Sequence, residues 1–134
     1  MSNRVLIIDD EASIRETLSG ILEDEGFETL SSESAEQGIE LLDKELIDII
    51  LLDIWLGDNM DGLEALGIIK ERFNMPVIMI SGHGNVETAV QATKKGAFDF
   101  IEKPLSYEKI LVAITNGLRF AKLEKENRLL RESS

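Results

Sequence analysis

Cysteine is absent from the sequence, so neither disulfide bonds nor zinc sites built on thiolates can stabilise the fold. A chain of 134 residues can bury a hydrophobic core without such supports. The first expectation is therefore one globular domain, and a reducing cytoplasm would suit it.

Long hydrophobic runs are also missing. No apolar stretch approaches the roughly 20 residues that a membrane-spanning helix needs, and residues 1–11 run into acidic side chains without a small-residue cleavage site. We therefore expect a cytoplasmic protein that has no membrane partner.

Positive charge is scarce. Lys and Arg number 14 against 26 Asp and Glu, which gives a formal net charge of -12. A field of this sign repels a phosphate backbone, so we expect no direct nucleic-acid binding by this chain. Most acidic side chains are expected to form a solvated surface, and the exceptions have to be identified by position.

Two signatures of enzymes are weak or missing. His83 is the only histidine, and no acidic residue stands beside it to orient the imidazole, so we favour a role in a surface loop over catalysis. The sequence also lacks the G-x-x-x-x-G-K-[ST] loop that would bind ATP.

The sequence does contain an alternation of two patterns. Short apolar runs with residues that favour strands alternate with longer stretches that have helical spacing. The five runs are Arg4–Ile8, Phe27–Leu30, Asp48–Leu52, Pro76–Ile80 and Ala97–Ile101. The alternation predicts five successive units of a β-strand and an α-helix.

The longer stretches carry further signals of helices. Gly26 stands where the first helix would end, and Ser34 and Gln37 have capping-box spacing at the start of the second. The fourth helix is expected from about Asn85 to Lys95. Apolar stripes are predicted at Ile14, Leu18, Ile21 and Leu22, at Leu41 and Leu42, and at Leu63, Leu66, Ile69 and Phe73.

This alternation favours an α/β fold with a parallel sheet, right-handed crossovers and helices on both faces. The runs IILL and VIMI are apolar at every position, as expected of central strands that are covered on both sides. Ligands of such folds bind beyond the carboxyl ends of the strands. Functional residues should therefore follow the apolar runs directly.

Carboxylates follow the first and third runs. Asp9, Asp10 and Glu11 come after the first and Asp53 after the third, so they converge if these two strands are neighbours. Clustered carboxylates repel one another unless a cation neutralises them. Oxygen ligands without His or Cys favour Mg²⁺. The sequence therefore predicts an acidic pocket for Mg²⁺.

A hydroxyl follows the fourth run, at Ser81, and an ammonium group follows the fifth run, at Lys103. A carboxylate can attack phosphorus to form an acyl phosphate, while Mg²⁺, an ammonium and a hydroxyl neutralise or bind the phosphoryl oxygens. Taken singly, Ser81 suits a turn, Lys103 a solvated surface and Asp9 or Asp10 a helix cap. Their joint occurrence at four strand ends favours phosphoryl transfer.

The motifs VLIIDDE, IILLD, DG, ISGHG and FDFIEKP together resemble the receiver domain of two-component response regulators, from about Arg4 to Asn116. The resemblance implies a flavodoxin-like (βα)5 three-layer sandwich with a five-stranded parallel sheet of order 2-1-3-4-5. It also implies a domain that is not an enzyme on other molecules and catalyses only its own Mg²⁺-dependent phosphorylation and dephosphorylation.

By the same resemblance, Asp53 is the phosphoacceptor and part of a Mg²⁺ site. Asp10, Asp53 and the backbone carbonyl of Trp55 would bind the ion directly, and Asp9 would bind it through water.

The resemblance also assigns the residues around the phosphoryl group. Ser81 and Lys103 would contact it, and Phe100 would be an aromatic switch whose ring rotates as Ser81 moves toward the phosphate. A core aromatic is the alternative for Phe100, and the two roles are compatible. The bond between Lys103 and Pro104 is expected to be cis.

The loop after Asp53 departs from the family's pattern. Gly57 stands where proline is usual, and Asp61-Gly62 lies one residue later than usual. The extra residue comes after Trp55, so the predicted carbonyl ligand is retained. The DIWL start and the longer loop resemble the NtrX branch of NtrC-type regulators.

The last helix is expected from Ser106 to about Arg131, longer than packing on the sheet requires. We divide the chain into a receiver domain, residues 1–117, and a helical linker, residues 118–134. Spacings of three and four predict the start of a two-stranded coiled coil at Phe120, Leu123, Asn127 and Leu130. A solvated helix is the alternative.

The resemblance implies a switch that is phosphorylated by a sensor histidine kinase and controls a downstream output domain. A second copy would bind through the face of the fourth helix and fifth strand, through the last helix, or both. The resemblance to NtrC-type regulators implies that the chain is a fragment of a longer regulator, with a σ54-activating ATPase and a helix-turn-helix domain downstream.

Three other functions were considered. An aspartyl phosphatase would need D-x-D on the first strand, which is absent. A flavodoxin-like cofactor carrier would have to place the phosphate of its cofactor against the acidic DDE loop. A degenerate receiver would serve only as a dimerisation module, although every position for phosphoryl transfer is filled.

Overall fold

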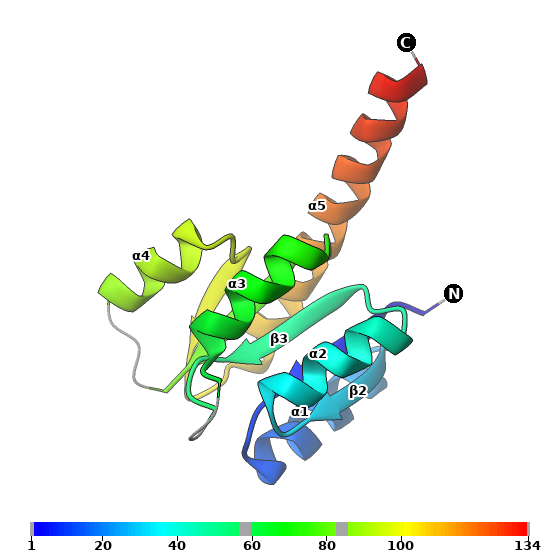
Figure 1. Cartoon of the computed structure of the whole chain (residues 1–134). Helices are drawn as coiled ribbons and strands as arrows, with labels where there is room; N and C mark the ends of the chain where they lie inside the picture. Colours follow the sequence, from blue (N-terminus) through cyan, green and yellow to red (C-terminus); the bar gives the residue numbers. More distant parts are fainter. Residues whose placement is uncertain (1, 57–59, 83–85, 134) are drawn as a thin grey trace.

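The computed structural model describes residues 2–56, 60–82 and 86–133, which form a parallel sheet with helices on both faces (Figure 1). Gly57, His83 and Asn85 lie outside the described residues. The strands are β1 (Arg4–Ile8), β2 (Glu28–Ser32), β3 (Ile49–Asp53), β4 (Val77–Ser81) and β5 (Asp99–Glu102). The helices are α1 (Ala12–Asp24), α2 (Ala35–Lys44), α3 (Gly62–Arg72), α4 (Val86–Lys94) and α5 (Tyr107–Ser133).

The order of the strands is β2-β1-β3-β4-β5, and all neighbours are parallel. The predicted (βα)5 sandwich and its strand order are therefore confirmed. Because β3 lies between β1 and β4, the predicted site residues at the ends of these strands meet at the carboxyl-terminal end of the sheet. Ile8 pairs with Leu52, and Asp53 pairs with Ile80.

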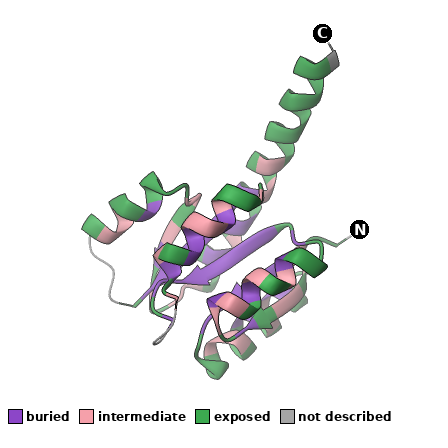
Figure 2. Ribbon diagram, in the orientation of Figure 1, coloured by how far each residue is buried: buried purple, intermediate pink, exposed green. Residues whose placement is uncertain are grey.

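Alternation along the strands divides the core between the two faces of the sheet. Leu6 and Ile8 point to the layer of α2, α3 and α4, whereas Val5 and Ile7 point to the layer of α1 and α5. Figure 2 shows β3 buried along its whole length, and all five of its residues are buried. The continuous apolar run of a central parallel strand is thus explained by cover on both sides.

β1 has its predicted bounds, and the other four strands differ from theirs by one or two residues at each end. β2 begins at Glu28 and continues to Ser32, beyond the predicted end at Leu30, because Ser31 and Ser32 still pair with β1. Asp53 and Ser81 are the last residues of β3 and β4. Hydrophobicity marks only the apolar part of a strand, while the backbone ladder continues through polar residues, including the buried Asp53 and Ser81.

The predicted helix signals are present in the structure. The Ser34 hydroxyl accepts a hydrogen bond from the Gln37 backbone N–H at 3.2 Å. Gly26 and Gly96 follow α1 and α4 with φ angles of 91° and 104°, which glycine adopts at little cost. The peptide bond between Lys103 and Pro104 is cis, as expected.

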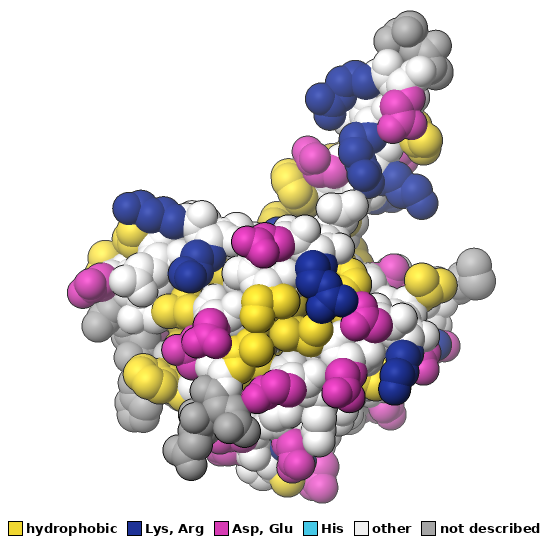
Figure 3. Space-filling model, in the orientation of Figure 1, with side chains coloured by type: hydrophobic (Ala, Val, Ile, Leu, Met, Phe, Trp, Pro, Cys, Tyr) yellow, Lys and Arg dark blue, Asp and Glu magenta, His cyan; other side chains and the backbone are white. Residues whose placement is uncertain are grey.

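Helix α5 runs without a break through Gly117 and continues away from the sheet (Figure 1). Ile110, Ala113 and Ile114 are buried against the sheet, whereas residues 122–132 are exposed. Figure 3 shows Lys and Arg side chains gathered on this extended part. The division of the chain at residue 117 stays a prediction. Among the described helices, none combines the length and apolar character needed to cross a membrane.

Candidate functional site

Asp9 follows β1 and is held in place by the backbone on both sides. Its N–H donates to the Ser32 carbonyl at 3.2 Å, and its carboxylate Oδ1 accepts from the Glu11 N–H at 2.9 Å. The Arg15 guanidinium donates to the Asp9 carbonyl at 2.8 Å. Asp9 is only 1% exposed, so it is a buried carboxylate in a fixed orientation.

Asp53 ends the central strand and is 2% exposed. Its Oδ1 accepts a hydrogen bond from the Trp55 N–H at 3.2 Å. The Ile54 N–H donates to the Ile80 carbonyl at 3.0 Å, which keeps the chain paired with β4 just beyond the carboxylate. Asp53 thus has one oxygen bound to the backbone and a second that faces its charged neighbours.

The three predicted aspartates converge. Carboxylate oxygens of Asp9, Asp10 and Asp53 lie within 4.8 Å of one another, and Asp10 is exposed while the other two are buried. Asp9 Oδ2 is buried and has no hydrogen-bond partner within the described residues. Three carboxylates with an unsatisfied oxygen fit a hard divalent cation such as Mg²⁺, which takes oxygen ligands. The residues present therefore fit the expected metal.

Lys103 supplies a positive charge to this cluster. Its Nζ lies 3.4 Å from Asp9 Oδ2, 3.4 Å from Asp53 Oδ2 and 3.6 Å from Glu11 Oε1. The backbone positions it, because the Lys103 N–H donates to the Ser81 carbonyl at 2.8 Å. Burial alone would lower the pKa of Lys103, but the carboxylates of Asp53, Asp9 and Glu11 outweigh it and raise that pKa. The ammonium group therefore stays charged at neutral pH.

Ser81 lies on β4, next to the strand that carries Asp53, and Phe100 lies on β5, one strand further out. Ser81 is fully buried at the end of β4, and Phe100 is partly buried on β5, where it pairs with Met79. Phe100 packs against the core cluster beneath α2, α3 and α4. This packing fits the core alternative for Phe100, and its role as a switch stays a prediction.

Gly62 makes room for the backbone that carries Asp53. A Cβ atom on Gly62 would lie 2.2 Å from the Asp53 carbonyl oxygen and 2.5 Å from Ile54 Cα. The Gly62 N–H donates to the Ile54 carbonyl at 2.8 Å, and Asp61 caps α3 by accepting from the Glu64 N–H at 2.8 Å. The Asp61-Gly62 pair therefore starts α3 directly against the end of β3.

Sequence reasoning assigned no individual role to Glu11, which lies 3.6 Å from Lys103, or to Arg15, which holds the Asp9 carbonyl. The DDE motif was the only signal for Glu11, and nothing in the spacing pointed to Arg15. Trp55 has an exposed side chain, at 57%, beside the aspartate cluster. The structure thus places an aromatic reporter next to the site.

Burial and the neighbouring charge of Asp9 raise the pKa of Asp53 from 3.8 to about 6, against the opposing effects of Lys103 and the Trp55 N–H. A carboxyl with a raised pKa stabilises the fold fully below its unfolded pKa, and this stability is lost as the pH rises through about 6. Ionised Asp53 therefore destabilises the metal-free fold at neutral pH.

We expect Asp53→Asn to be more stable than the parent chain in chelator at pH 7.5, by about 1 to 3 kcal/mol. The difference should shrink toward zero at pH 4, and added Mg²⁺ should reduce it at pH 7.5. Urea unfolding at both pH values measures it, with the exposed Glu40→Gln as the control. A destabilised Asp53→Asn at pH 7.5 would contradict this account.

A receiver domain is the class of protein that this fold and this acidic cluster define. The chain matches the response regulator receiver domain family over residues 5–115 and belongs to that family. Receiver domains of response regulators are regulatory rather than catalytic, and they typically bind Mg²⁺ at an acidic pocket.

Regulators of the NtrX type are among the proteins to which this chain is similar. The nitrogen assimilation regulatory protein NtrX of Azorhizobium caulinodans is 45% identical over 134 residues, 98% of this chain and 30% of that protein. A putative NtrX-like response regulator of Rickettsia conorii is 46% identical over 125 residues, 92% of this chain and 26% of that protein. The crystal structure of NtrX from Brucella abortus has a TM-score of 0.89 at 42% identity, over 97% of this chain and 30% of that one.

These matches confirm the predicted resemblance to the NtrX branch. The chain spans less than a third of the length of these relatives.

Proposed function

We propose that this chain is a phosphorylation-activated receiver that accepts a phosphoryl group from a sensor histidine kinase on Asp53. In the cytoplasm it would control the dimerisation and activity of a downstream domain that regulates transcription. The observation that carries the proposal is the position of Asp53, buried at the end of the central strand beside two aspartates and 3.4 Å from the Lys103 ammonium.

The chemistry requires a nucleophile and neutralisation of charge. An Asp53 oxygen attacks the phosphorus of a phosphoimidazole, a P–O bond forms as the P–N bond breaks, and the imidazole leaves with a proton from solvent. Lys103 stabilises the negative charge on the phosphoryl oxygens, and the Ser81 hydroxyl donates to one of them. Attack of water on phosphorus later breaks the P–O bond and returns the Asp53 carboxylate with inorganic phosphate.

Asp10, Asp53 and the Trp55 carbonyl would hold Mg²⁺ directly, with Asp9 behind a water. The ion supplies charge neutralisation at the phosphoryl oxygens.

Trp55 is the only tryptophan, so its emission reports on this site. We expect Mg²⁺ to change that emission in a saturable way, and Asp10→Asn to weaken binding about tenfold or more. Glu40→Gln should leave the titration unchanged, and an equal response of Asp10→Asn would contradict the ligand assignment.

The experiment that tests the proposal uses a small donor with a P–N bond. The chain is incubated with phosphoramidate and either Mg²⁺ or chelator, and its intact mass is followed. We expect the gain of one phosphoryl group with Mg²⁺ and none with chelator. If no phosphoryl group is gained in either case, the proposal fails. The better hypothesis is then a degenerate receiver that serves only as a dimerisation module.

Phosphorylation is expected to shift the population between two conformations at the ends of β4 and β5. Ser81 would move toward the phosphoryl group and Phe100 would rotate. We therefore expect the largest amide chemical-shift changes near Ser81, Phe100 and Lys103 when a phosphoryl mimic is added. Unchanged amide spectra at these residues, with the mimic bound, would disprove the switch.

Dimerisation has two candidate surfaces. Val86 and Val90 of α4 are 80% and 45% exposed, so these two side chains offer an apolar surface, whereas Ala92 of the same helix is buried in the core. On α5, Leu123 and Leu130 are 57% and 68% exposed at coiled-coil spacing. Both surfaces support the proposed homodimer, and the ATPase and DNA-binding domains would lie beyond the linker, residues 118–134.

A further inference from the structure

A cavity lies at the end of the sheet opposite Asp53. Its volume is about 730 Å³, within the range of sites that bind small molecules. The cavity is lined by the residues that directly precede three strands, namely Asp48 before β3, Pro76 before β4 and Phe98 before β5. The cavity is therefore separated from the phosphorylation site by the length of the strands, and the proposed function does not use it.

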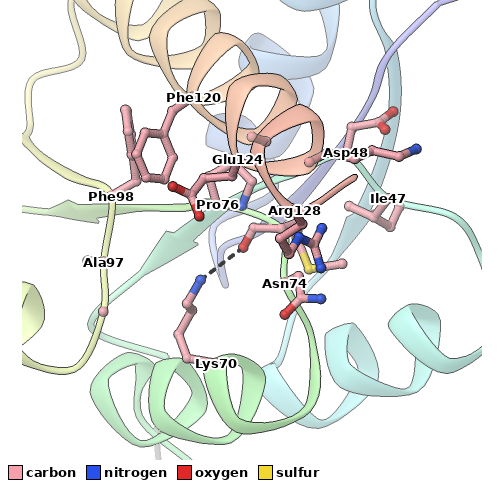
Figure 4. A pocket seen from close by; sticks show the side chains of 14 residues that line it. Ile47, Asp48, Lys70, Asn74, Pro76, Ala97, Phe98, Phe120, Glu124 and Arg128 are labelled. Carbon is pink, nitrogen blue, oxygen red and sulfur yellow. Dashed lines mark hydrogen bonds between the residues drawn. The ribbon is translucent and has the colours of Figure 1, made fainter. Parts of the chain in front are cut away.

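Its apolar wall comes from both the sheet and the extended helix. The rings of Phe98 and Phe120 lie 5.5 Å apart with an interplanar angle of 41°, and Phe120 is 51% exposed. Figure 4 shows these two rings on one side of the cavity, with Pro76 beside them. A half-exposed aromatic pair offers a surface against which a further aromatic ring can pack.

Cationic side chains line the cavity from two helices. Lys70 reaches in from α3, while Lys125 and Arg128 come from α5 (Figure 4). Lys70 Nζ donates to the Met75 carbonyl at 3.4 Å, and its stem runs over Gly96. Within the described residues, neither Lys125 nor Arg128 forms an ion pair.

Two acidic side chains share the lining, Asp48 and Glu124. Asp48 Oδ2 already accepts the Arg4 backbone N–H at 2.7 Å. The cavity therefore has one more cationic than acidic side chain, in a chain whose net charge is -12. This local reversal of sign favours an anion beside the aromatic wall.

We propose that this cavity binds a small ligand that carries an aromatic ring and one anionic group. The ring packs against Phe98 and Phe120, and the anion contacts Lys70 and Arg128. Because these residues lie on α3, on α5 and just before β5, a bound ligand bridges the receiver body and the emerging helix. Occupancy would thus restrain the segment that leads out of the domain.

Two fluorescent probes of similar shape test the proposal, anilinonaphthalene sulfonate, which is anionic, and phenylnaphthylamine, which is neutral. We expect saturable binding of the sulfonate and binding of the neutral probe that is weaker by about threefold to tenfold. Amide shifts on titration should centre on Ala97, Phe98, Ala121 and Glu124. Equal binding of the two probes, or shifts centred elsewhere, would overturn the proposal.

Matched variants separate the two parts of the site. Lys70→Gln and Arg128→Gln should each weaken the binding of the sulfonate by about threefold to tenfold. Lys122→Gln removes a charge of α5 outside the cavity and should leave this binding unchanged. Phe120→Ala should weaken the binding of both probes about tenfold, whereas Leu129→Ala should leave it unchanged. If the controls weaken the sulfonate as much as the cavity variants do, binding is nonspecific and the proposal is wrong. The Asp53→Asn variant should bind both probes with the affinity of the parent chain. The proposal for this cavity and the proposed function can therefore be disproved independently.

Discussion

Lys103→Met is expected to slow phosphorylation by about a hundredfold or more. The ammonium of Lys103 lies within 3.6 Å of three carboxylates, and its side chain is 17% exposed. Without it, Asp9 and Asp53 repel each other in a buried setting, and the incoming phosphoryl group loses the charge of the Lys103 ammonium. The rate of phosphoryl gain from phosphoramidate, followed by intact mass, measures the loss.

The same variant should also change stability and metal binding. In chelator we expect Lys103→Met to lose about 2 to 4 kcal/mol, because it leaves buried charges unpaired. Mg²⁺ should bind more tightly than in the parent, since the competing ammonium is gone, and should restore part of the stability. The exposed Lys109→Met serves as control and should keep the parental rate. A Lys103→Met chain that is folded, binds Mg²⁺ and is phosphorylated at the parental rate would refute the role of Lys103.

Gly62→Ala is expected to destabilise the fold by about 2 to 4 kcal/mol and to impair phosphorylation. The added methyl group would lie 2.2 Å from the Asp53 carbonyl oxygen and 2.5 Å from Ile54 Cα, both of them backbone atoms that carry the site. The start of α3 or the end of β3 must therefore move. Urea unfolding measures the loss, and the Mg²⁺ titration of Trp55 emission reports the displaced site.

Gly67→Ala is the matched control in the same helix. Nothing lies within 4 Å of a Cβ atom at Gly67, so alanine should add helix propensity, worth about 0.5 to 1 kcal/mol, without a clash. The two alanine substitutions should therefore change the free energy of unfolding with opposite signs. Equal effects at both positions would mean that the close approach of Gly62 to Asp53 does not constrain the site.

The sequence predicted the fold because each strand and helix carried its own periodic signal. β1 was predicted with its observed bounds, whereas β3 and β4 were predicted one residue too early at both ends, since Asp53 and Ser81 are polar residues within the ladder. β2 was shifted because two of its last residues are serines. Side-chain hydrophobicity does not report backbone pairing. The carboxyl ends of strands that carry polar site residues are therefore the least predictable.

The site could be predicted because its residues follow strands of a parallel sheet. Asp9, Asp10, Asp53 and Lys103 converge as expected once β1 lies beside β3. The contact of Arg15 with the Asp9 carbonyl could not be predicted, since it depends on the direction of one flexible side chain. The cavity between α3 and α5 was also missed, because it depends on where the extended helix leaves the sheet.

The position of the phosphoryl group tests the central claim most directly. After phosphorylation with phosphoramidate and Mg²⁺, borohydride reduces an aspartyl phosphate to homoserine, and tandem mass spectrometry of peptides locates it. We expect homoserine at position 53 and unmodified aspartate at positions 9 and 10. Unmodified Asp53 in a phosphorylated chain, or homoserine at another aspartate, would contradict the assignment of Asp53 as the phosphoacceptor.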